Sequence, residues 1–172
     1  MTQLDPTRYK LTEQESRAIF QKHIAPTLLA GAEPSTSPKA IILGGQPGAG
    51  KTLVMNESTR ELAQTGKPVA IVGDDLRAFH PRYAELSRKD PLNAAHYTDQ
   101  DSGRWVEMLI AAAKEKRVNV VIEGTMRRPE KVAQTMQELK AGGYQVEARA
   151  LAVNERVSWQ GVHTRYERQI GQ

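Results

Sequence analysis

The sequence contains no cysteine, and its 172 residues include only four histidines. The absence of cysteine excludes disulfide bonds and thiolate metal sites, and it agrees with a reducing, cytoplasmic location. The histidines are scattered along the chain without the spacing of a ligand cluster. We therefore expect no dedicated transition-metal site.

Long apolar runs are also missing. No segment approaches the length of a membrane-spanning helix, and the first ten residues, MTQLDPTRYK, lack the apolar stretch of a signal peptide. The net charge of +4 is mild, with 24 Lys and Arg against 20 Asp and Glu. This balance suits anionic small molecules, so we expect neither a nucleic-acid nor a membrane partner.

Short apolar runs alternate with helical patterns from residue 40 onward. The expected strands are residues 40–44, 69–73, 118–123 and 144–153. The expected helices are residues 51–65, 76–88, 99–117, 129–142 and 155–170. This alternation predicts an α/β fold of the P-loop kinase type, with a parallel sheet and helices on both faces.

A helical segment precedes the first strand. Thr12 and Glu15 form a capping-box pattern, and Ile19, Phe20 and Ile24 then fall on one helical face. The loop GAEPSTSPK follows. We divide the chain into an N-terminal helical appendage, residues 1–38, and a P-loop kinase domain, residues 39–172.

The segment GGQPGAGKT between the first strand and the next helix matches the pattern G-x-x-x-x-G-K-[ST]. The matching residues are Gly45, Gln46, Pro47, Gly48, Ala49, Gly50, Lys51 and Thr52. Glycines let several backbone N–H groups surround one anion, and the helix that follows directs its positive end toward the same place. Lys51 would reach the β and γ phosphates of ATP, and the Thr52 hydroxyl would bind Mg²⁺.

Acidic residues follow the second and third strands. Asp74 comes just after the second strand, where it could act as a general base or as a helix N-cap, and Asp75 is better placed as the cap. Glu123 ends the third strand in the pattern of a magnesium-binding acid, although a cap or ion pair is the alternative. Thr125 and Arg127 follow on the loop, and Arg127 could clamp an anionic substrate or face solvent.

The sequence pattern alone does not decide the roles of two further residues, Arg165 and Glu107. Arg165 lies off the apolar stripe of the last expected helix, where it could approach the γ-phosphate or face solvent. Glu107 lies off the Trp105, Leu109 and Ala112 stripe of its helix, so it is not a core residue.

Together these segments resemble the zeta toxin family of P-loop kinases from bacterial toxin–antitoxin systems. The resemblance covers residues 40–167 and depends on LGGQPGAGKT, GDDLRAFHPRY, VIEGTMRR, GGYQVEARALAV and TRYE. It implies transfer of the γ-phosphate of ATP, with magnesium, to the 3′-hydroxyl of UDP-N-acetylglucosamine. It also implies a small helical antitoxin as a partner.

The resemblance assigns roles to individual residues. Asp74 matches the catalytic base, and Arg165 matches an arginine that stabilises the transferring phosphoryl group. Glu107 matches an acid that contacts the nucleotide sugar. Glu123, Thr125 and Arg127 match the motif between the sugar and phosphate sites.

Family members continue beyond the RYE segment with a second phosphate-contacting arginine, whereas this sequence stops at Gln172. One expectation is therefore that the chain binds nucleotide but turns over slowly or not at all. Phosphorylation of another small-molecule hydroxyl is a further alternative.

Overall fold

The computed structural model describes residues 4–44, 51–124 and 129–150. Within these residues four strands form one sheet: β1 (Lys39–Gly44), β2 (Val69–Val72), β3 (Val120–Glu123) and β4 (Gln145–Ala150). All neighbouring strands are parallel, in the order β2-β3-β1-β4. The prediction of a parallel sheet is confirmed. The strand order reverses at β1, which is where open α/β sheets bind their ligands.

Nine helical elements precede or connect these strands within the described residues. In chain order they are α1 (Glu13–Ile19), η1 (Phe20–Ile24), α2 (Ala25–Leu28), α3 (Lys51–Ala63), α4 (Gly73–Leu76), η2 (Arg77–Phe79), α5 (Tyr83–Lys89), α6 (Ala94–Lys116) and α7 (Pro129–Ala141). None of these described helices has the length and apolar character needed to cross a membrane.

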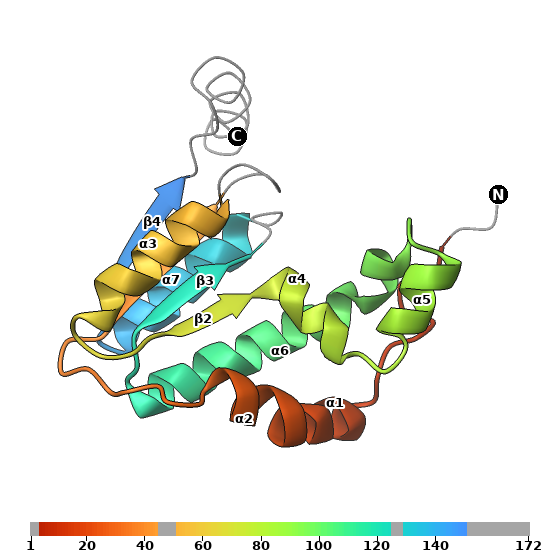
Figure 1. The fold of residues 1–172 in the computed structure, drawn as a ribbon, viewed down its shortest axis with the longest axis horizontal. Helices are drawn as coiled ribbons and strands as arrows, with labels where there is room; N and C mark the ends of the chain where they lie inside the picture. Colours follow the sequence, from red (N-terminus) through yellow and green to blue (C-terminus); the bar gives the residue numbers. More distant parts are fainter. Residues whose placement is uncertain (1–3, 45–50, 125–128, 151–172) are drawn as a thin grey trace, which may run out of the picture.

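Helices cover both faces of the sheet because successive strand residues alternate between them. Ile41, Leu43 and Val121 pack against α3 on one face. On the opposite face Ile42 and Ile122 belong to a larger core with residues of α6, α7 and the N-terminal helices. Figure 1 shows α3 and α6 on opposite sides of the sheet, with α1 and α2 along α6. The predicted two-sided helical covering is confirmed.

The N-terminal helices join this core through both apolar and polar contacts. The Thr12 hydroxyl accepts a hydrogen bond from the Glu15 backbone N–H at 3.1 Å, which confirms the predicted cap. Phe20 and Ile24 are buried in the larger core. The indole N–H of the fully buried Trp105 in α6 donates to the Ser16 carbonyl at 3.0 Å. This bond ties α1 to α6.

A buried asparagine fixes both ends of the segment that contains the glycine-rich loop. The Asn119 side-chain carbonyl accepts from the Lys39 backbone N–H at 2.8 Å, at the start of β1. Its amide donates to the Leu62 carbonyl at 3.1 Å and to the Thr65 hydroxyl at 2.9 Å, at the end of α3. Because Asn119 is fully buried, these bonds satisfy polar groups that water cannot reach.

Two predicted helix boundaries are wrong. Residues 76–88 do not form one helix, because the chain turns between η2 and α5 at His80 and Pro81. His80 adopts an extended conformation, as a residue before proline prefers, and Pro81 has no N–H to continue a helix. The following helix, α6, begins at Ala94 instead of Asp99. The expected last helix, residues 155–170, lies outside the described residues.

Candidate active site

The ends of three neighbouring strands place the predicted acidic residues along one edge of the sheet. Glu123 ends β3, where it lies opposite Leu43 of β1 and Val72 of β2. β1 leads through Gly44 into the glycine-rich segment, and β2 leads through Gly73 to Asp74. Because the strands are parallel, Gly44 at the end of β1, Glu123 at the end of β3 and Asp74 just after β2 all lie at the carboxyl edge of the sheet.

Asp74 lies in the first turn of the short helix α4. The N-cap position of α4 is Val72, so neither Asp74 nor Asp75 is the cap, and the predicted capping role is wrong. The Asp74 side chain is 57% exposed and forms an ion pair with Arg77, whose Nη2 lies 3.2 Å from its Oδ1. No hydrogen bond to Asp74 Oδ2 is formed by any residue that the structure describes. That oxygen can therefore accept a proton from a bound hydroxyl.

The pKa of Asp75 reflects both its partial burial and the negative charge gathered at this edge of the sheet. Burial, followed by the neighbouring carboxylates of Glu123 and Asp74, raises the pKa of Asp75 above its ordinary value of 3.8. Like charges that raise a pKa in this way also favour a bound cation. The edge is therefore suited electrostatically to Mg²⁺, which prefers oxygen ligands.

Replacement of Asp75 by asparagine should raise the thermal stability of the protein near pH 7. A folded-state pKa above the unfolded value means that the ionised carboxylate is less favourable in the folded chain, so stability is lost as pH rises through this range. The stability gain of Asp75→Asn should vanish below about pH 3.8, where both states bind the proton.

The test is thermal unfolding of Asp75→Asn and wild type between pH 7 and about pH 3.8, which measures the difference in melting temperature at each pH. Glu57→Gln, at an exposed position of α3, is the matched control for net charge. An Asp75→Asn melting temperature equal to or below that of wild type near pH 7 would contradict this account of the edge.

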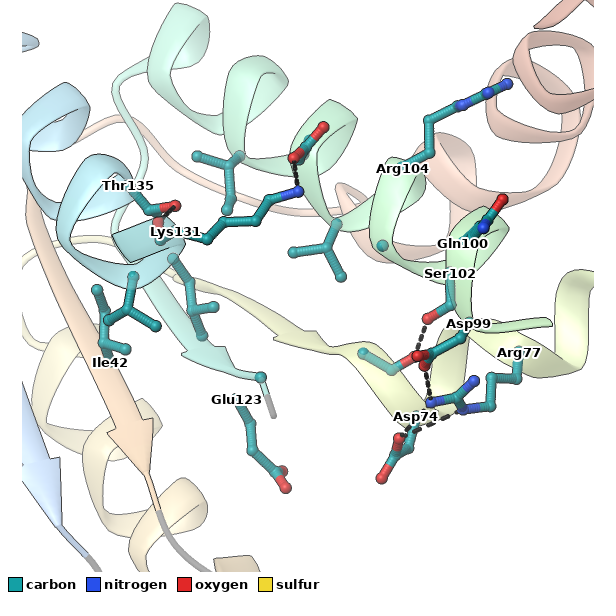
Figure 2. A pocket seen from close by; sticks show the side chains of 18 of the residues that line it. Ile42, Asp74, Arg77, Asp99, Gln100, Ser102, Arg104, Glu123, Lys131 and Thr135 are labelled. Carbon is teal, nitrogen blue, oxygen red and sulfur yellow. Dashed lines mark hydrogen bonds and ion pairs between the residues drawn. The ribbon is translucent and has the colours of Figure 1, made fainter. Parts of the chain in front are cut away.

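A cleft of about 820 Å³ extends from this edge between α4, α6, β3 and α7. Its size falls within the range of about 300–1,000 Å³ that is typical of small-molecule sites. Asp74, Glu123 and Glu107 all line the cleft. Figure 2 shows the Asp74 and Glu123 side chains at one end of it. The structure thus brings together three residues that the sequence placed far apart.

An ion pair joins two helices across the cleft. Glu107 of α6 contacts the ammonium of Lys131 of α7, and both side chains are about half exposed. Lys131 was not predicted from the sequence, where nothing distinguishes it from other surface lysines. A substrate that binds Glu107 has to rearrange or share this ion pair.

Arg77 and Asp99 also line the cleft and were not predicted. Nη2 of Arg77 lies 2.6 Å from Oδ1 of Asp99 as well as contacting Asp74. The spacing of three between Asp74 and Arg77 is a sequence signal for an ion pair on one helix, and it could have identified Arg77. Asp99 carries no comparable local signal.

Several predicted residues lie outside the described part of the chain. They are Gly45, Gln46, Pro47, Gly48, Ala49, Gly50, Thr125, Arg127 and Arg165. Lys51 is the first residue of α3, and Thr52 is exposed in its first turn. Both positions agree with the sequence motif, which requires a helix start directly after the loop.

The described residues suit magnesium bound together with a nucleotide. No group of three or more His, Cys, Asp or Glu side chains among them could hold a metal ion alone. Mg²⁺ at phosphate sites usually takes one or two protein oxygens, phosphate oxygens and water, so it does not need such a group. The hydroxyl of Thr52 and the carboxylate of Glu123 are oxygen donors of the required kind.

Comparison with known sequences identifies relatives of the chain. A family model described as zeta toxin matches residues 26–172. Toxin PezT of Streptococcus pneumoniae is 37% identical over 156 residues, which cover 91% of this chain and 60% of that protein. Toxin zeta of Enterococcus hirae is 32% identical over 153 residues, which cover 87% of this chain and 53% of that protein. The chain thus spans little more than half the length of these relatives.

Comparison with solved structures also finds a protein of the PezAT toxin–antitoxin system. A structure from the characterisation of the PezAT chromosomal toxin–antitoxin system of S. pneumoniae matches with a TM-score of 0.76 and 32% identity. The match covers 96% of this chain and 66% of the other. A candidate kinase from Chloroflexus aurantiacus matches with a TM-score of 0.51 and 16% identity, which indicates a shared fold.

Proposed function

The chain belongs to the zeta toxin family, and on this premise we propose that it is an ATP-dependent phosphotransferase that acts as a bacterial toxin. The proposed acceptor is the 3′-hydroxyl of UDP-N-acetylglucosamine. The observation that carries the proposal is the arrangement of Asp74, Glu123 and Gly44, the last residue of β1, along one sheet edge that opens into a cleft.

ATP would bind where β1 passes into α3. The backbone N–H groups of the glycine-rich segment and the amino end of α3 provide positive partial charge for the phosphates. Lys51 adds a full positive charge at the first position of α3. Thr52 and Glu123 would hold magnesium, which neutralises charge on the phosphate oxygens when it is bound.

Asp74 would act as the general base. Its Oδ2 would take the proton of the sugar hydroxyl while the hydroxyl oxygen forms a bond to the γ-phosphorus of ATP. The bond between that phosphorus and the β–γ bridging oxygen breaks, and ADP leaves. The carboxyl group holds the proton until the phosphorylated sugar is released.

The remaining proposed residues position the substrates. Glu107 would accept hydrogen bonds from the nucleotide sugar in the cleft, which places the sugar on the α6 side of Asp74. Thr125 and Arg127 would bind between the sugar and phosphate sites. Arg165 would stabilise charge on the transferring phosphoryl group.

A toxin of this kind requires control inside its own cell. The similar S. pneumoniae structure comes from a toxin–antitoxin system, and this supports a small helical antitoxin as a proposed partner of the present chain. We further propose a cytoplasmic location, where the nucleotide sugar is present. We also propose that the chain divides into an N-terminal helical appendage, residues 1–38, and a P-loop kinase domain, residues 39–172.

A panel of acceptors tests the proposed substrate. The protein is incubated with magnesium, ATP and one acceptor at a time, and mass spectrometry detects the addition of a phosphate. We expect one added phosphate on UDP-N-acetylglucosamine and none on free N-acetylglucosamine or an aminoglycoside. Phosphorylation of a different acceptor would overturn the substrate assignment, and binding of ATP without any product would overturn the proposed activity.

A further inference from the structure

Arg77 is a buried arginine in η2, and it lies between the cleft and helix α6. Only 6% of its surface is exposed, although it borders the cleft. Its guanidinium donates through Nε and Nη2 to Oδ1 of Asp74, at 3.3 and 3.2 Å. It also donates to the Ala95 carbonyl at 2.7 Å and to Oδ1 of Asp99 at 2.6 Å. All three guanidinium nitrogens are therefore engaged within the protein.

These contacts argue against a direct role of Arg77 in binding phosphate. An arginine that clamps a phosphate presents two N–H groups to the ligand. Here the two carboxylates and the carbonyl already use the nitrogens, as the dashed lines around Arg77 in Figure 2 show for the carboxylates. The guanidinium instead acts on Asp74.

Asp74 needs such a partner because its own surroundings restrain it little. It lies in a helix of four residues and its side chain is more than half exposed. Both Arg77 donors contact the same oxygen, Oδ1, so they restrict rotation of the carboxyl group while leaving Oδ2 directed elsewhere. A general base has to lie within about 2.6–3.2 Å of the proton donor's heavy atom, which free rotation would prevent for much of the time.

The other contacts of Arg77 connect this carboxylate to α6. Ala95 and Asp99 belong to the first part of α6, and Glu107 lies further along the same helix. A partly buried bond also joins α4 to α6, because the Ser102 hydroxyl donates to the Gly73 carbonyl at 2.6 Å. Helix α6 thus supports both the base and the proposed sugar contact, and Arg77 is the connection that reaches the carboxylate itself.

We propose that Arg77 is a positioning residue that fixes Oδ1 of Asp74, presents Oδ2 to the acceptor hydroxyl and sets the base relative to Glu107. This inference depends on the proposed phosphotransferase function. It assigns Arg77 an effect on the transfer step and none on the binding of ATP.

Steady-state kinetics of Arg77→Ala and Arg77→Lys test the inference. A misplacement of about 1 Å can cost roughly 100-fold in rate, so we expect kcat of Arg77→Ala to fall by about 10- to 100-fold while KM for ATP stays near wild type. Because the vacated space borders the cleft, added guanidinium should restore part of kcat. Arg77→Lys should retain intermediate activity, since one ammonium cannot reproduce the two-nitrogen contact with Asp74.

Ser102→Ala is the control for general loosening of α4 from α6. It removes the bond to Gly73 without touching Asp74, so we expect a smaller loss of kcat and no response to guanidinium. Equal losses in Ser102→Ala and Arg77→Ala, with no guanidinium rescue, would overturn the positioning role in favour of a structural one.

The double variant Asp74→Asn with Arg77→Ala separates this inference from the proposed function. If Arg77 acts through Asp74, the double variant should be no slower than Asp74→Asn alone. Full additivity of the two losses would overturn the inference. An inactive Asp74→Asn beside a fully active Arg77→Ala would refute the inference alone, whereas a fully active Asp74→Asn would refute the base and with it the proposed mechanism.

Discussion

Asp74→Asn should lower kcat for phosphoryl transfer by roughly 10²- to 10⁴-fold, the usual contribution of a general base. A sugar hydroxyl is a weak nucleophile, so in the proposed mechanism its deprotonation and its orientation would both depend on this carboxylate. Asparagine keeps the shape of the side chain but cannot take the proton. Binding of ATP and of the nucleotide sugar, measured by calorimetry, should remain near wild type.

Asp75→Asn is the matched control for this variant. The two residues are neighbours in the first turn of α4, and both substitutions remove one negative charge from the same edge of the sheet. We expect Asp75→Asn to change kcat much less than Asp74→Asn does. The reverse order of effects would show that the base is assigned to the wrong residue.

Lys51→Ala should abolish measurable phosphoryl transfer, with a loss of at least about 10²–10³, the range for removal of one preorganised donor. Lys51 is the lysine of the glycine-rich motif and the first residue of α3. Its charge should act on the β and γ phosphates, so the variant should also bind ATP more weakly. Circular dichroism and thermal unfolding should stay close to wild type, because alanine is a good helix former.

Lys116→Ala controls for the loss of a positive charge. Lys116 is exposed at the last position of α6, just before the chain turns into β3 at the amino edge of the sheet. We expect wild-type kinetics from this variant. Wild-type transfer by Lys51→Ala would disprove the assignment of the motif as a phosphate site.

The sequence predicts the layout of the sheet edge because that layout depends on local patterns. Four apolar runs separated by helical patterns correspond to the four described strands. In a parallel sheet the residues just after successive strands gather at one edge, so Asp74 and Glu123 could be placed together from their positions alone. The Thr12 cap was also predictable, since it involves residues only three apart.

Features that depend on packing between distant helices could not be predicted in this way. The contact between Glu107 and Lys131 joins residues 24 positions apart, and it depends on how α6 and α7 lie across the cleft. The contact of Arg77 with Asp99 likewise requires the position of η2 on α6. By contrast, the break at His80 and Pro81 did carry a local signal, and the predicted helix at 76–88 passed over it.

The fate of the γ-phosphate tests the central claim most directly. The protein is mixed with magnesium, UDP-N-acetylglucosamine and ATP labelled at the γ-phosphate, and the labelled species are separated over time. We predict that the label moves from ATP to the nucleotide sugar, that NMR of the product places the ester at the 3′ position of the sugar, and that Asp74→Asn slows this transfer. Label that remains in ATP, or that appears only as inorganic phosphate, would contradict the assignment of this chain as a nucleotide-sugar kinase.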